Sequence, residues 1–115
     1  MSAVGLSLAS IVQSAGSLPE VRKSDLHFGD WVIVKTVKST YRIRALGGDM
    51  YRVTGGWFEK KGLPPMELRI SGCTWGGSTI KTDVIAACGL SIEFGNRVIT
   101  SPIRKIIVLP VHTQN

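Results

Sequence analysis

The stretch "WVIVKTVKSTYRIRALGGDMYRVTGG", residues 31–56, decides the fold of this 115-residue chain. Residues 31–37, 40–46 and 50–59 form three runs rich in β-branched and aromatic side chains, and turn-forming residues separate them. Such runs are typical of strands joined by short turns. The stretch therefore predicts a three-stranded antiparallel meander whose last strand bends at Gly55-Gly56.

The turn at 47–49 sets the register of the second hairpin. A three-residue loop keeps inward residues opposite inward residues, whereas a four-residue loop would mix the two faces. The predicted cross-strand pairs are Leu46 with Met50, Ala45 with Tyr51, Arg44 with Arg52, and Ile43 with Val53. Facing arginines are destabilising by less than about 1 kcal/mol, so we expect a compensating interaction nearby.

The same alternation extends back through a turn near Lys38-Ser39 and divides the meander into two faces. In this register Ile33 faces Arg44 and Lys35 faces Arg42. The predicted core face consists of Val32, Val34, Thr36, Tyr41, Ile43, Ala45, Tyr51 and Val53. The predicted outer face consists of Trp31, Ile33, Lys35, Arg42, Arg44 and Arg52.

Four cations and a tryptophan on one face suggest a surface for an anion. Lys and Arg neutralise phosphates, and Trp31 offers a platform on which a base could stack. Two alternatives stay open. The face is an ordinary solvated surface balanced by acids such as Asp30 or Asp49, or an N-terminal helix covers Trp31 and Ile33.

The remaining sequence continues the β pattern. Residues 66–75, 90–95, 97–101 and 103–111 are predicted strands, and 79–89 is either a strand with a turn or a short helical turn. Seven or eight short strands without room for crossover helices predict an all-β fold, a small antiparallel barrel of SH3-like size. Residues 29–115 form this domain, and residues 1–28 form an N-terminal helix and connector.

The first sixteen residues contain no Lys or Arg, so they lack the basic start of a secretory signal. Their apolar residues recur at helical spacing, which predicts a short amphipathic helix that docks on the domain or on a neighbouring subunit. Leu8, Ile11 and Val12 are its candidate interface residues. A cytoplasmic location is expected by default.

Composition favours a binding protein. Fourteen Lys and Arg against eight Asp and Glu give a net charge of +6, which favours anionic partners. Cys73 and Cys88 are predicted to be buried free thiols, with a disulfide as the alternative. The two histidines and two cysteines have no zinc spacing, so we expect no metal and no cofactor.

Two further segments could bind a partner. Gly76, Gly77, Ser78 and Lys81 could direct backbone N–H groups and a charge at an anion, although P-loop spacing is absent and a structural turn is favoured. Trp57 and Phe58 could form an aromatic contact, with one of the two in the core. Ser101 has no evident His or Asp partner, so no nucleophile is predicted.

Five short motifs occur in order: "GD" at 29–30, S-x-Y at 39–41, "GGWF" at 55–58, GGS-x-x-K at 76–81 and "TSPIR" at 100–104. In this order they resemble a family of small bacterial β-domain proteins of unknown function. The resemblance covers about residues 29–108 and implies a β-domain without assigned activity or catalytic residues.

We therefore expect a non-enzymatic binding module whose basic sheet face meets an anionic partner, with nucleic acid as the first candidate. The alternative is a structural or assembly subunit of a larger complex, docked through its N-terminal helix and the Trp57-Phe58 edge. An enzyme that uses the GGS loop and Lys81 is the least favoured class. The sequence does not determine the oligomeric state.

Overall fold

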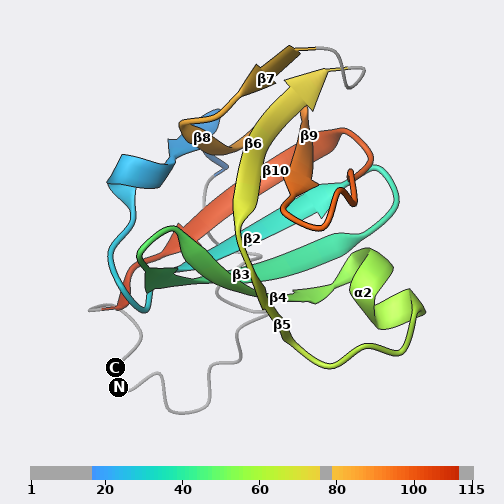
Figure 1. The fold of residues 1–115 in the computed structure, drawn as a ribbon. Helices are drawn as coiled ribbons and strands as arrows, with labels where there is room; N and C mark the ends of the chain where they lie inside the picture. Colours follow the sequence, from blue (N-terminus) through green and yellow to red (C-terminus); the bar gives the residue numbers. More distant parts are fainter. Residues whose placement is uncertain (1–16, 76–78, 112–115) are drawn as a thin grey trace, which may run out of the picture.

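The computed structural model describes residues 17–75 and 79–111, and nearly all of their regular structure is β. Within these ranges ten strands occur: β1 (Glu20–Arg22), β2 (Trp31–Thr36), β3 (Thr40–Gly47), β4 (Met50–Gly55), β5 (Met66–Leu68), β6 (Ile70–Trp75), β7 (Thr79–Lys81), β8 (Val84–Ala87), β9 (Ser91–Phe94) and β10 (Ile103–Leu109). A 3₁₀ turn η1 (Lys23–Asp25) and one short helix α2 (Gly56–Lys60) complete the regular structure of the described residues (Figure 1).

The strands form three antiparallel sheets. The largest has the order β10-β2-β3-β4-β5, a second has the order β7-β6-β9, and β1 pairs with β8. The all-β, antiparallel prediction is confirmed. A single closed ladder is not found within the described ranges, because β5 and β6 belong to different sheets although only Arg69 separates them. The predicted N-terminal helix lies outside the described residues.

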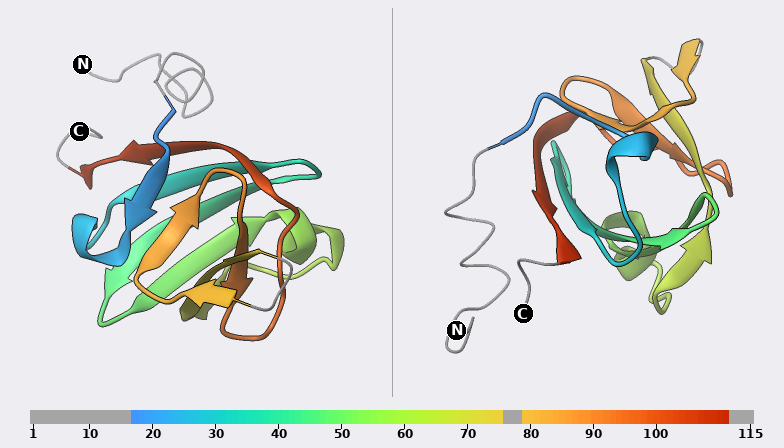
Figure 2. Two further views of the ribbon diagram at one scale, coloured as in Figure 1. Left: turned by 90° about the horizontal axis from the view of Figure 1, so that it is seen from above. Right: turned by 90° about the vertical axis from the view of Figure 1, so that its left-hand side faces the viewer.

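The sheets enclose one core, around which they curve in the end view of Figure 2 (right). Side chains from all three sheets meet there, including Val34, Ile43, Ile85, Ile92 and Phe94. The eight residues predicted for the inner face of the meander are all buried. The period of two was therefore sufficient to assign that face.

Two predictions about local structure are wrong, and one open alternative is decided. Residues 56–59 do not continue the third strand: Gly55 and Gly56 adopt φ of +91° and +51°, and the chain then makes one turn of helix. Residues 97–101 form only an isolated bridge, Glu93 with Ile99. The ambiguous segment 79–89 forms β7 and β8, joined by a turn at 82–83.

Candidate anion-binding surface

The outer face of the five-stranded sheet is built from cross-strand rows. One row runs from β10 to β5 through Leu109, Trp31, Arg44, Arg52 and Glu67. Opposite residues in antiparallel strands point to the same side of the sheet, so these five side chains share one face. All five predicted residues, Trp31, Lys35, Arg42, Arg44 and Arg52, lie on this face.

The predicted arginine pair is present, and the structure shows how its repulsion is offset. Arg44 lies opposite Arg52. The Nη2 of Arg52 donates to Oε2 of Glu67 on β5 at 2.7 Å, and the Arg44 guanidinium lies 5.4 Å from the Trp31 ring centroid. The outer face thus contains an acid from β5, which lies outside the predicted three-stranded meander, and two of the four predicted cations are already engaged.

The register of the first hairpin differs from the prediction by two residues. Trp31 faces Arg44, Ile33 faces Arg42 and Lys35 faces Thr40. The cause is the turn, which spans 36–39 and is closed by hydrogen bonds from the backbone N and Oγ1 of Thr36 to the Ser39 carbonyl. A shift of two keeps every side chain on its predicted face but changes its neighbours. At the second turn a bulge places Gly47, not Leu46, opposite Met50.

Two predicted cations remain exposed. Lys35 and Arg42 are open to solvent, and neither makes an ion pair with any described residue. Lys105 of β10 lies directly opposite Lys35, and Arg42 lies in the neighbouring row, opposite Ile33, so three positive charges gather at this end of the face. The positive end of the face is therefore the end nearest the β2–β3 turn.

Two adjoining hollows continue from this end of the sheet. One, of about 290 Å³, is lined by Arg42, Lys38, Ser39 and Lys60, with Glu59 as the one carboxylate among its described residues. The other, of about 370 Å³, shares Lys38, Ser39 and Lys60 and adds Tyr41, Trp57, Ile99, Thr100 and Ser101. We call the two together the lysine groove. Within the described ranges Lys38 and Lys60 also have no ion-pair partner.

Hydrogen bonds between residues far apart in the sequence hold the walls of the lysine groove. The backbone N of Lys38 donates to Ser101 Oγ at 3.0 Å, and Ser101 Oγ donates to Thr36 Oγ1 at 2.7 Å. The backbone N of Trp57 donates to the Tyr41 hydroxyl at 3.0 Å. Ser101 thus has a structural role that fixes the β2–β3 turn against the segment before β10.

The predicted aromatic pair is divided between core and surface. Phe58 is fully buried, with its ring centroid 5.2 Å from that of Phe94. Trp57 is half-buried, lines the lysine groove and has the Lys61 ammonium 5.8 Å from its ring centroid. Only Trp57 can therefore meet a partner without unfolding α2.

The other predicted sites fall mostly outside the described residues. Gly76, Gly77 and Ser78 of the anion loop, and Leu8, Ile11 and Val12 of the N-terminal segment, all lie there. Lys81 is described; it is exposed, and its Nζ lies 3.8 Å from Glu20 Oε1. These expectations stay predictions.

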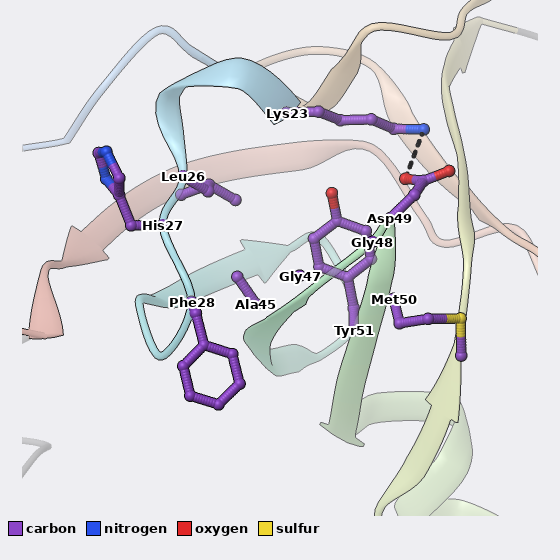
Figure 3. Close-up of a pocket in the computed structure, with 10 residues that line it drawn as sticks. All are labelled: Lys23, Leu26, His27, Phe28, Ala45, Gly47, Gly48, Asp49, Met50 and Tyr51. Carbon is purple, nitrogen blue, oxygen red and sulfur yellow. Dashed lines mark ion pairs between the residues drawn. The ribbon is translucent and has the colours of Figure 1, made fainter.

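A smaller hollow of about 130 Å³ lies at the opposite end of the meander, beside the β3–β4 turn (Figure 3). The Lys23 ammonium pairs with Asp49 Oδ1 at 3.2 Å above the Tyr51 ring. Burial, assisted by the Asp49 carboxylate, raises the pKa of Tyr51 to about 12, so this phenol stays protonated at neutral pH. The described residues that line the hollow include no evident pair of base and nucleophile.

Both cysteines are free, but only one is buried as predicted. Burial raises the pKa of the Cys73 thiol to about 11, which makes it unreactive at neutral pH. Cys88 is exposed, contrary to the prediction. Among the described residues no three His, Cys, Asp or Glu side chains gather as a metal site, and no helix there is long and apolar enough to cross a membrane.

Comparison of the chain with family models, curated proteins and solved structures gives no significant match. The resemblance to a bacterial β-domain family therefore rests on the short motifs alone. The structure gives three of these motifs physical roles: "GGWF" forms the bend into α2, Tyr41 of S-x-Y contacts it, and "TSPIR" braces the β2–β3 turn.

Proposed function

We propose that this chain is a non-enzymatic binding module that presents a basic surface to nucleic acid. The observation that carries the proposal is a group of exposed cations without ion-pair partners among the described residues, three of which line one hollow. They come from the sheet face, the β2–β3 turn and α2, and comprise Lys35, Arg42, Lys38 and Lys60. The net charge of +6 also favours association with a polyanion.

The chemistry of the lysine groove suits a flexible polyanion. Ammonium and guanidinium groups neutralise successive phosphates, and the half-buried Trp57 offers a ring for one base. The compact β-scaffold, which we regard as barrel-like, would hold these groups in fixed positions. A cytoplasmic location belongs to the same proposal and agrees with two free thiols.

The test is fluorescence anisotropy of a labelled, mixed-sequence single-stranded oligonucleotide. Between about 50 and 200 mM salt the affinity should fall by at least about tenfold, because each phosphate contact releases counterions. Arg42→Glu should weaken binding by about tenfold or more, since it reverses a phosphate-contacting charge. Arg52→Glu should have a smaller effect, because Glu67 already engages Arg52.

Arg97→Glu is the matched control, since Arg97 is also exposed and the substitution changes the net charge equally, but Arg97 lines neither part of the lysine groove. Its effect should stay below about threefold. Equal losses of affinity in Arg42→Glu and Arg97→Glu would show that binding depends on net charge alone and not on the lysine groove. Absence of binding at low salt would refute the proposal.

The second candidate, an assembly subunit, is favoured by one observation. Ile99 is 47% exposed beside Trp57 in the lysine groove, so an apolar side chain of a protein partner could pack there. Association through this edge would be lost in Ile99→Asp and would change little with salt. The opposite salt response separates it from nucleic-acid binding.

A further inference from the structure

The outer face of the five-stranded sheet has an apolar strip in addition to its basic end. Ile33 of β2 and Ile107 and Leu109 of β10 are 3%, 2% and 7% exposed, and Trp31 packs against them. Ile107 lies opposite Ile33, and Leu109 lies opposite Trp31. These four residues, the outer strip, form a cluster separate from the main core.

The sequences of β2 and β10 are typical of strands that are buried on both faces of a sheet. A sheet with one solvated face alternates apolar and polar residues, whereas a sheet covered on both sides has continuous apolar runs. "WVIV" at 31–34 and "IIVL" at 106–109 are continuous runs. On β3, by contrast, three of the four outward positions, Thr40, Arg42 and Arg44, are polar, and only Leu46 at the bulge is apolar, so the cover should end at that strand.

The described chain begins at the edge of the outer strip. The backbone N of Leu18 donates to the Ile106 carbonyl at 2.9 Å, and the Ile106 N donates to Ser17 Oγ at 3.2 Å. Ile106 precedes Ile107 of the outer strip, and Figure 2 shows the first described residues beside β10. Residues 1–16 are therefore joined to the domain next to this surface.

We propose that residues 1–16 of the same chain pack on the outer strip and account for its burial. The segment contains no Asp, Glu, Lys or Arg, so it suits an apolar surface and avoids the basic rows. As a helix, five of its apolar residues would share one side, and these are Val4, Leu8, Ile11, Val12 and Ala15. A helix of this length extends about 24 Å, enough to cover two strands spaced about 5 Å apart.

The direct test is a methyl NOE experiment on the full chain. We expect NOEs from Leu8 and Ile11 methyl groups to Ile33 and Ile107 methyl groups. A sample that mixes differently labelled chains should show none of them between molecules. Intermolecular NOEs would assign the strip to a second copy of the chain and overturn the proposal, as would the absence of any NOE to the strip.

A pair of double variants tests the energetics. Leu8→Asp/Ile11→Asp places two charges on the apolar side of the segment, and Ser10→Asp/Gln13→Asp places two on its polar side. In a background that retains only Trp31, the first pair should increase acrylamide quenching of Trp31 at least twofold and the second should leave it unchanged. Far-UV circular dichroism verifies that the β-domain stays folded.

Identical quenching in both double variants and in the parent protein would contradict docking through the apolar side. The result is independent of the nucleic-acid proposal, because Lys35, Arg42, Lys38 and Lys60 are not part of the outer strip. Evidence against one proposal would therefore not contradict the other.

Discussion

Asp30 connects two distant parts of the chain through one buried carboxylate, which is 3% exposed. Its Oδ2 accepts a hydrogen bond from the His27 backbone N at 2.8 Å, and its Oδ1 accepts one from the Val111 N at 2.9 Å. Burial by itself raises the pKa of Asp30. The backbone donors, and His27 nearby, favour the charged form more strongly, so the pKa is lowered.

Asp30→Ala should therefore destabilise the protein in a pH-dependent way. At pH 7 we expect a loss of about 2 kcal/mol, since two backbone donors lose their acceptor. Because the pKa of Asp30 is lower in the folded state, its carboxylate stabilises the protein fully at pH values above the unfolded-state pKa, near 3.9. This stabilisation is lost as the pH falls through the folded-state pKa. Urea unfolding should thus show a smaller difference in the free energy of unfolding between the variant and the parent protein near pH 3 than at pH 7.

Asp83→Ala serves as the comparison, because Asp83 is exposed and its side chain accepts no hydrogen bond from a described residue. It should change the free energy of unfolding by less than about 0.5 kcal/mol at either pH. If Asp30→Ala lowered the free energy of unfolding by the same amount at both pH values, the ionised carboxylate would not be what stabilises the 27–30 turn.

At the scale of single elements, the bend before α2 depends on a close approach that only glycine permits. Gly56 has a φ of +51°, and a Cβ placed there would lie 2.1 Å from an atom of the Tyr41 ring. The same ring contacts Phe58 and Phe94 in the core, at centroid distances of 6.3 and 5.6 Å. The bend, the helix and the core are therefore packed around one tyrosine.

Gly56→Ala should cost about 3 kcal/mol, the sum of a left-handed backbone penalty and overpacking against Tyr41. Gly62→Ala isolates the first contribution. Gly62 has a φ of +70°, and a methyl group added there would meet no described atom within 4 Å, so a loss of about 1 kcal/mol is expected. Chemical denaturation of both variants measures the difference. Equal losses would mean that Tyr41 moves aside without cost.

The sequence predicted the meander well, because its information is local. The period of two assigned every inner residue from Val32 to Val53, and the 47–49 turn placed Arg44 opposite Arg52. The first hairpin was misaligned by two residues because a shift of two leaves the face pattern unchanged. Helix α2 was missed because five residues are too few to display a helical period.

The lysine groove could not be predicted from the sequence, because its walls come from three separate segments. Residues 38–39, 57–60 and 99–101 meet only after the sheets have packed. Glu67 was overlooked as the partner of Arg52 for a related reason: β5 returns to β4 after the α2 excursion, and nothing local indicates this pairing. The sequence identified the charges but not their neighbours.

At the scale of the whole molecule, stability is distributed unevenly among the sheets. β2 lies inside the largest sheet, between β10 and β3, and five of its six residues are at least half-buried. β7 lies at the edge of the second sheet, and all three of its residues are exposed. Opening of β7 therefore disrupts few apolar contacts, whereas opening of β2 disrupts the core.

Native-state hydrogen exchange should reflect this difference. Hydrogen-bonded amides of β2 and β3 should exchange only through global unfolding, with protection at least about a hundredfold higher than amides of β7. Residue-resolved exchange measured by NMR at several urea concentrations would rank the elements. If β7 and β2 were equally protected, the three sheets would unfold as one cooperative unit.

The pairing of β2 with β10 also sets a condition on how a ribosome can produce this fold. β2 meets β3 soon after both are made, but its other edge pairs with β10, whose residues 103–109 are translated far later. Until then, that edge presents unpaired backbone groups from an apolar strand, which is the kind of surface that invites aggregation. The nascent chain should therefore depend on rapid completion of synthesis, or on a chaperone, during this interval.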